Sequence, residues 1–128
     1  MEKHVRFFGL LQAGEMAQQM LRSHVFVLPS VIENSPNTLG EAMLLGLPCV
    51  SSYVGGAPDM AEDGKEVLFY RDNDSAVLAY QIRKVFKDDD LALSLSRQAR
   101  QRALVTHDPV RNRDALLACY RSITGVEL

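Results

Sequence analysis

The stretch from Val25 to Ser52, VFVLPSVIENSPNTLGEAMLLGLPCVSS, most narrowly limits what this chain can fold into. It begins with four apolar residues in a row, which favours a strand covered on both faces, as in a parallel sheet. A polar loop follows, and a helical pattern begins near Pro36, where Ser35 can cap the free amides. Gly46 and the proline two residues later end that pattern, and a second strand begins at Cys49. The stretch therefore predicts a βαβ unit whose loop lies at the carboxyl end of a strand, where open α/β sheets bind ligands.

The segments on either side of this unit also alternate between strand and helix patterns. Before it, Val5–Phe8 is typical of a strand, and residues 15–22 of a short helix. After it, the sequence predicts a strand over residues 66–70 and then helices from about Asp74 to Ile123, interrupted at aspartates. About four strands interleaved with helices, followed by a C-terminal helical cluster, predict an α/β fold with a parallel sheet.

The composition argues against several classes of protein. A length of 128 residues suits one domain, and a formal net charge of -2 gives no reason to expect a nucleic-acid partner. We see neither a signal peptide nor an apolar run of membrane-spanning length. The two cysteines lack ligand-like spacing, which fits a reducing, cytoplasmic setting. The histidines, His4, His24 and His107, also lack ligand-spaced companions, so we expect surface histidines and no metal site.

Glu33 and Glu41 are the first candidates for chemistry, since paired carboxylates can act as acid and base. On one continuous helix they would be about 12 Å apart, and Pro36 instead places Glu33 in the loop. The two side chains therefore suit different parts of one ligand: Glu41 a ribose diol, and Glu33 a second sugar. The residues alone leave an alternative open, in which Glu41 simply favours the helix and Glu33 is a solvated loop residue.

Two neighbouring features add possible ligand contacts. The first amides of the predicted helix are unpaired and form an anion site suited to a diphosphate; they belong to Asn37, Thr38 and Leu39. Downstream, Gly55 and Gly56 let the backbone approach another group closely or adopt positive φ. Asp59 and Glu62 follow, and either line the nucleotide cleft or cap a short helical turn.

The tract PSVIENSPNTLGEAMLLGLPCVSSYVGG resembles the signature of the retaining nucleotide-sugar glycosyltransferases of family four. That signature has a strand ending in Pro-Ser, two glutamates separated by seven residues, Glu-Ala-Met, a Gly-x-Pro turn and a Gly-Gly loop. The similarity extends from about Val5 to the C-terminal helix. It implies that residues 1–128 are the partial C-terminal, nucleotide-sugar-binding domain of a two-lobed GT-B enzyme, with a partial Rossmann-like sheet.

By matching position, the resemblance implies that Glu33 faces the donor sugar and the reacting centre as the catalytic residue, and that Glu41 binds the ribose hydroxyls. The further substrate-binding residues that it implies are Ser35, Asn37, Thr38, Leu39, Gly55 and Gly56. The implied reaction is transfer of a hexosyl-type group from a nucleotide sugar with retained configuration, without metal or cofactor, and with local ion pairing to the leaving diphosphate. The implied acceptor is a glycan or a lipid-linked glycan, in the cytoplasm or peripherally at the inner face of its membrane.

The chain also departs from the family pattern. Family members have an N-terminal domain that supplies much of the acceptor site, and two more strand-helix units with an Arg/Lys pair for the diphosphate. No such pair stands at the expected place here, so we expect this chain to be inactive by itself. Without those units the strand at Val25–Leu28 has a bare edge, and either Val5–Phe8 or a second copy of the chain pairs with it. Two rival interpretations remain: a GT-B-fold sugar-nucleotide epimerase, and a short non-catalytic nucleotide-binding or interaction module.

Overall fold

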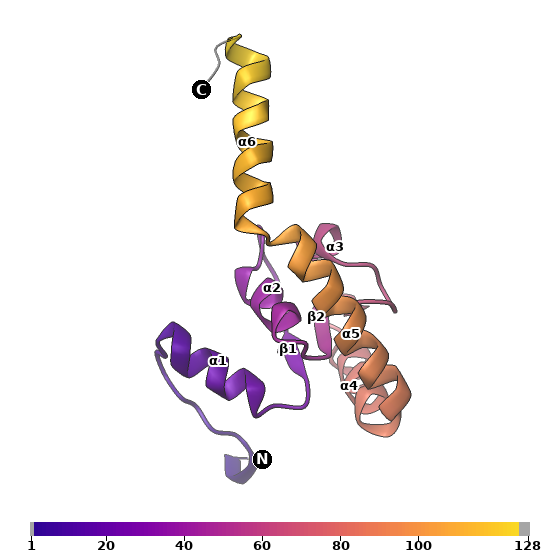
Figure 1. Cartoon of the computed structure of the whole chain (residues 1–128). Helices are drawn as coiled ribbons and strands as arrows, with labels where there is room; N and C mark the ends of the chain where they lie inside the picture. Colours follow the sequence, from indigo (N-terminus) through magenta and orange to yellow (C-terminus); the bar gives the residue numbers. More distant parts are fainter. Residues whose placement is uncertain (1, 126–128) are drawn as a thin grey trace.

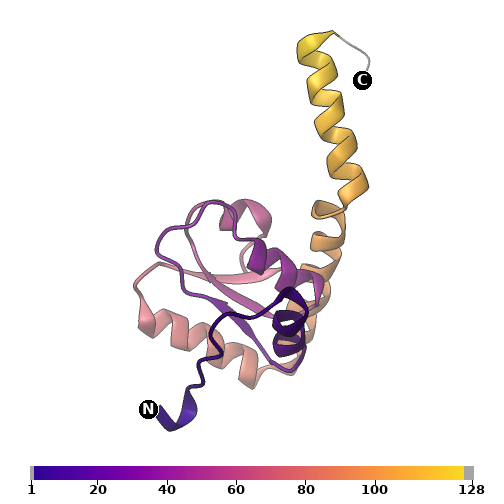
Figure 2. The same ribbon diagram turned by 90° about the vertical axis from the view of Figure 1, so that its left-hand side faces the viewer.

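The computed structural model describes residues 2–125 and contains a parallel sheet with helices on both faces (Figures 1 and 2). The strands β1 (Phe26–Leu28), β2 (Cys49–Ser52) and β3 (Val67–Tyr70) lie side by side in that order. Phe26 of β1 pairs with Cys49 of β2, which pairs with Val67 of β3. Every residue of β2 and β3 is buried, including Ser51 and Ser52, as in a sheet covered on both sides. In β1 only Leu28 is buried, and the other two residues are half-buried. This confirms the predicted α/β class.

The helices follow the predicted order along the chain. They are the 3-10 turn η1 (Glu2–His4), α1 (Ala13–Leu21), α2 (Asn37–Leu44), α3 (Ala57–Met60), α4 (Ser75–Lys87), α5 (Asp89–Thr106) and α6 (Pro109–Thr124). Asp74, Asp88 and Asp108 each accept a backbone N–H at the start of α4, α5 and α6, respectively. The aspartates therefore start the three C-terminal helices by capping them.

The sheet divides the core into two hydrophobic clusters, one on each of its faces. Figure 2 shows the helices that lie on the two sides of the strands. Alternate strand residues point to opposite faces, so neighbours in β2 enter different clusters. Cys49 packs with α2 and the second half of α5, whereas Val50 packs with α4 and the first half of α5. Helix α2, which carries the predicted site, is thus held between the sheet and α5.

The N-terminal strand prediction is wrong. Residues 5–8 form no strand, and the Phe7 side chain is 92% exposed. The sheet of the described residues 2–125 consequently has three strands, where the sequence predicts about four. An extended segment is stable only when a neighbouring strand accepts its backbone hydrogen bonds, and Val5–Phe8 does not pair with the open edge of β1.

Helix α6 also departs from the expected C-terminal cluster. It projects away from the sheet (Figure 1). All of its side chains are exposed except that of Leu117, which is half-buried. Of the three C-terminal helices, α4 packs against β2, β3 and α5, and α5 packs against α2 and α4. Within residues 2–125, no helix combines the length and the apolar character needed to cross a membrane.

Candidate functional site

The first turn of α2 lies just beyond the carboxyl end of β1. Pro36 occupies the cap position, and the Ser35 side chain makes no capping hydrogen bond, so the predicted Ser35 cap is wrong. The amide of Leu39 is not free either, because it donates to the Pro36 carbonyl at 3.0 Å. Within residues 2–125 the structure records no acceptor for the amides of Asn37 and Thr38. The predicted anion site is therefore reduced to two amides and the positive end of the helix dipole.

Glu33 precedes this turn and is held by a hydrogen bond that the sequence does not predict. The Ser30 hydroxyl donates to Glu33 Oε1 at 2.8 Å, and the Ser52 hydroxyl donates to the Ser30 carbonyl at 2.6 Å. Ser30 comes just after β1, and Ser52 is the last residue of the neighbouring parallel strand β2. This placement is the sequence signal that could have predicted their contacts near Glu33. The half-buried carboxylate is thus fixed at the carboxyl edge of the sheet.

The glycine pair after β2 packs against the loop that carries Glu33. Gly55 has a φ of +53°, and a Cβ there would lie 2.6 Å from the carbonyl carbon of Glu33 and closer still to its oxygen. A Cβ at Gly56 would overlap the carbonyl oxygen of Asn34, to which the Gly56 amide donates at 2.7 Å. Both options that the sequence left open, close approach and positive φ, are therefore realised. What the glycines approach is the backbone of the Glu33 loop.

Two pockets flank α2, and each contains two of the predicted site residues. The other four, Glu33, Asn37, Leu39 and Gly55, line neither pocket. The first, of about 380 Å³, lies between α1 and α2, and its polar side chains are Thr38 and Glu41. Its other lining residues are apolar: Leu11, Ala13, Met16, Ala17, Met20, Leu44 and Leu45. The second, of about 420 Å³, is lined by Asn34, Ser35, Gly56, Asp59, Met60, Thr106 and His107. The arrangement offers an apolar pocket with one carboxylate on one side of α2 and a polar pocket on the other.

His107 belongs to the second pocket, whereas the sequence predicts a surface histidine. Its half-buried ring lies against Gly40 in the middle of α2. The Thr106 hydroxyl donates its proton to the Arg102 carbonyl at 3.1 Å, so it accepts from Nδ1–H of His107 at 2.9 Å. A glycine inside a helix costs about 1 kcal/mol relative to alanine and calls for a packing reason. That signal at Gly40 could have predicted a close neighbour.

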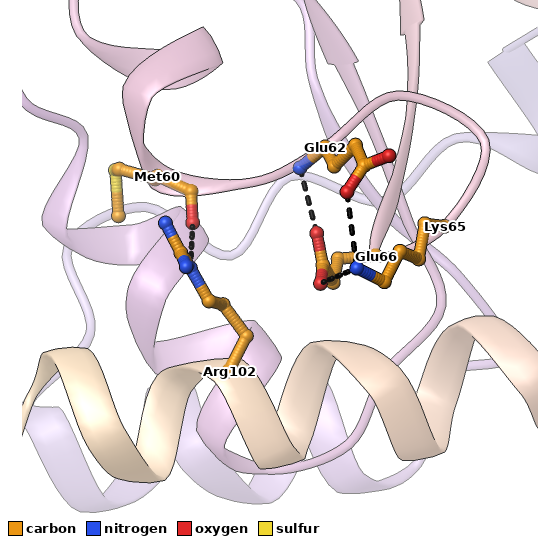
Figure 3. Close-up of polar contacts among 5 residues, drawn as sticks. All are labelled: Met60, Glu62, Lys65, Glu66 and Arg102. Atoms are coloured by element: carbon orange, nitrogen blue, oxygen red, sulfur yellow. Dashed lines mark hydrogen bonds and ion pairs between the residues drawn. The ribbon is translucent and has the colours of Figure 1, made fainter.

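A group of polar contacts ties α3 to β3 and α5 (Figure 3). The buried carboxylate of Glu66 accepts the Glu62 amide at 2.7 Å, and the Lys65 ammonium lies 3.0 Å from Glu62 and 3.6 Å from Glu66. These carboxylates, Glu62 first, raise the pKa of the exposed Lys65. Arg102 of α5 donates to the Met60 carbonyl at 3.4 Å. These contacts attach α3 to α5 and stabilise the turn between α3 and β3.

The two carboxylates after the glycine pair have separate roles. Gly56 is the cap residue of α3, and no side chain caps this helix. Asp59 lines the polar pocket beside α2 and does not cap α3. Glu62 instead pairs with Lys65. In the part of the chain that the structure describes, no three His, Cys, Asp or Glu side chains are placed to hold a metal ion.

Comparison with known proteins places this geometry in a family. The family described as "Glycosyl transferases group 1" matches residues 1–102, which is most of the chain. The sulfoquinovosyl transferase of Arabidopsis thaliana is 31% identical over 98 residues, covering 74% of this chain and 19% of that enzyme. Glycogen synthase of Mycobacterium tuberculosis is 34% identical over 97 residues, covering 76% of this chain and 23% of that enzyme. The chain thus spans about a fifth of the length of these relatives.

Solved structures agree with this assignment. Anabaena HepE in complex with UDP-glucose has a TM-score of 0.77 and 26% identity, over 80% of this chain and 28% of that one. Sucrose-phosphate synthase of Thermosynechococcus elongatus has a TM-score of 0.74 and 26% identity, over 89% of this chain and 31% of that one. The C-terminal domain of a group 1 glycosyl transferase from Francisella tularensis, at 17% identity and a TM-score of 0.70, shows the same fold over 78% of this chain and 51% of that one. The resemblance inferred from the sequence is confirmed: the chain belongs to the glycosyl transferases group 1 family.

Proposed function

We propose that residues 1–128 form the C-terminal, donor-binding domain of a retaining glycosyltransferase. The observation that carries the proposal is the first turn of α2, where two amides without recorded acceptors lie between Glu33 and Glu41 in the sequence. Two findings support the proposal: the chain belongs to a glycosyl transferase family, and HepE, which is similar over most of the chain, was solved with UDP-glucose. The donor is accordingly a nucleotide sugar.

Each part of the donor has a place along α2 in this proposal. The apolar pocket between α1 and α2 takes the nucleoside, and Glu41 at this pocket accepts hydrogen bonds from the ribose hydroxyls. The amides of Asn37 and Thr38 bind the diphosphate, with support from the helix dipole. Ser35 and the Gly55–Gly56 pair belong to the sugar side, because Ser35 and Gly56 line the second pocket. Leu39 contributes through its buried side chain, which anchors the turn.

Glu33 faces the sugar and the reacting centre. In the transfer, the bond between the anomeric carbon and a diphosphate oxygen breaks, and the oxygen of an acceptor hydroxyl bonds to that carbon on the same face. The proton of that hydroxyl passes to the leaving diphosphate oxygen. Positive charge develops on the sugar ring and negative charge on the leaving diphosphate. The Glu33 carboxylate, which Ser30 orients, stabilises the positive charge on the sugar ring. The amides of Asn37 and Thr38 stabilise the negative charge on the diphosphate. We expect no metal or other cofactor in this reaction.

The charge around the site sets the strength of donor binding. Neither pocket beside α2 is lined by Lys or Arg, so a diphosphate would meet amides and one helix dipole there. Such contacts without a positively charged side chain supply only part of what a phosphate needs. We therefore propose that this chain by itself binds a nucleotide sugar weakly and is inactive, and that other parts of the enzyme supply the cations.

Titration of the chain with UDP-glucose, followed by amide NMR, tests this assignment. The Asn37 and Thr38 amide signals should shift, and Glu41→Ala should weaken binding about tenfold or more, since a hydrogen bond to a charged group contributes about 1.5–3 kcal/mol. Glu62→Ala, which removes an exposed glutamate outside both pockets, is the control and should bind like the parent chain. Shifts confined to other residues, or equal binding by both variants, would show that the donor lies elsewhere.

The catalytic assignment is tested in an enzyme in which this domain is joined to an acceptor-binding lobe. There Glu33→Ala should lower kcat more than it raises KM, because the carboxylate acts mainly on charge that develops in the transition state. Glu41→Ala should chiefly raise the KM for the donor. Wild-type turnover by both variants would refute the two roles.

The partners and location follow from the same proposal. The acceptor is a glycan or a lipid-linked glycan held mainly by an N-terminal lobe, and the reaction takes place in the cytoplasm. Exposed apolar residues on α6 support peripheral contact with the inner face of the membrane; they include Val110, Leu116, Tyr120 and Ile123. The unpaired edge of β1 supports pairing of two copies, which light scattering of the chain would detect as a dimer.

A further inference from the structure

A tyrosine at the end of β2 presents its ring to solvent in a fixed position. The Tyr53 side chain is 62% exposed, yet its ring makes an edge-on contact with buried Phe69, with centroids 5.5 Å apart and planes at 79°. Its amide donates to the Tyr70 carbonyl at 2.8 Å, which extends the pairing of β2 with β3 by one residue. The exposed aromatic face is therefore held by the sheet.

This ring lines a pocket of about 310 Å³ that also contains a carboxylate and a guanidinium. Asp63 is oriented by its Oδ1, which accepts the Phe69 amide at 2.8 Å, and the structure records no partner for Oδ2 within residues 2–125. For the Arg71 guanidinium, too, no hydrogen bond or ion pair is recorded among the described residues. The pocket thus combines an apolar face, an oriented acceptor and a donor of opposite charge.

The pocket and the loop of Glu33 lie at the same edge of the sheet. Tyr53 and Arg71 directly follow β2 and β3, and Glu33 follows β1, so all three lie at the carboxyl edge of one parallel sheet. Tyr53 precedes Gly55 by two residues, which places their Cα atoms within about 7.6 Å of each other. Gly55 in turn packs against the Glu33 carbonyl. A ligand on Tyr53 therefore lies at the same edge of the sheet as the loop that carries the proposed catalytic carboxylate.

We propose that Tyr53, Asp63 and Arg71 form a subsite for an uncharged pyranose, the acceptor sugar of the transfer. A pyranose has an apolar C–H face that packs on an aromatic ring and hydroxyls at its rim that both donate and accept. The carboxylate takes hydroxyl protons, the guanidinium donates to hydroxyl oxygens, and their opposite charges favour a neutral ligand over an anion. That this sugar is the acceptor rests on the proposed function, whereas the binding of a pyranose at these residues does not.

The test is an amide NMR titration of the chain with the methyl pyranosides of glucose, mannose and galactose. At least one of them should shift the signals of Asp63, Phe69 and Arg71. Tyr53→Ala should weaken that binding about tenfold, whereas Tyr53→Phe, which keeps the ring, should bind like the parent chain. The matched control is Tyr80→Ala, because the Tyr80 side chain on α4 is equally exposed, at 61%, and lies outside this pocket.

The possible failures can be told apart. The proposal is overturned if no pyranoside shifts these signals, if Tyr53→Ala binds as well as Tyr80→Ala, or if uridine shifts the same signals at lower concentration than the sugars do. A dispersed amide spectrum of Tyr53→Ala shows that the variant is folded. A separate titration with UDP-glucose tests the donor site. If the amide signals of Asn37 and Thr38 shift in Tyr53→Ala as in the parent chain, the proposed donor site is supported. If they do not shift in either chain, the donor site is refuted, and the pyranoside titration still decides the sugar site.

Discussion

The contact between Gly40 and His107 makes a quantitative prediction about stability. A Cβ added to Gly40 would lie 2.9 Å from Cε1 and 3.1 Å from Cδ2 of the His107 ring, and closer still to Nε2. Packed carbon atoms are normally about 3.5–4.0 Å apart. Because Thr106 holds the ring through Nδ1, the imidazole cannot swing away without losing a hydrogen bond. We therefore expect Gly40→Ala to be destabilising, although alanine is the better helix former.

The magnitude follows from two opposing effects. Overpacking in a well-filled site costs about 1–3 kcal/mol, and an overlap with three ring atoms belongs at the upper end. Replacing glycine by alanine inside a helix contributes about 1 kcal/mol of stability. The net effect of Gly40→Ala should be a loss of about 2 kcal/mol in the free energy of unfolding. In a His107→Ala background the overlap disappears, so Gly40→Ala should stabilise by about 1 kcal/mol.

Urea unfolding of the parent chain, the two single variants and the double variant measures the coupling energy, which should be about 3 kcal/mol. Gly14→Ala in α1 is the matched control, because a Cβ there meets nothing within 4 Å. It should be stabilising or neutral in both backgrounds. If Gly40→Ala stabilises the parent chain, or costs the same with and without the imidazole, the proposed packing of His107 on α2 is wrong.

Three further predictions concern loops, caps and thiols. Gly55→Ala should lower the free energy of unfolding far more than Gly64→Ala, as urea unfolding of the two variants would show. Both glycines have positive φ, but only a Cβ at Gly55 would overlap the backbone of another loop. Asp88→Ala should lose about 1 kcal/mol of stability with its α5 cap, as thermal unfolding would show, and an unchanged midpoint would contradict that role. Burial raises the pKa of the Cys49 thiol to about 12, so the thiol stays protonated at pH 8. Iodoacetamide should therefore modify only the exposed Cys119 in the native chain. Equal labelling of the two cysteines, measured by mass spectrometry, would contradict this.

Much of the fold could be predicted because its signals are local. The apolar residues of β1, β2 and β3 mark the three strands, and the aspartates before α4, α5 and α6 are the caps that the structure shows. Gly46, with φ of +74°, ends the last turn of α2 as expected. The segment Val5–Phe8 has an equally good local pattern, but a strand also needs a partner strand, and sequence pattern alone does not supply one.

The site divides in the same way. The spacing of Glu33 and Glu41 around a helix start, and the presence of a glycine pair, were determined by the sequence alone, because backbone propensity and proline geometry act within a few residues. The sequence did not predict which groups these residues meet. Ser30 orients Glu33, and the glycines press on the Glu33 loop, only because parallel strands bring their carboxyl ends to one edge.

Gly40 and His107 are the clearest case of what only the tertiary structure decided. Each looks unremarkable in its own segment, as a poor helix former and as a histidine without ligand-spaced companions. Their contact arises because α5 packs along α2 and ends beside its first turns, which brings together residues that lie far apart in the chain. Packing of this kind depends on shape and volume across the whole core. Local sequence preferences carry no record of it.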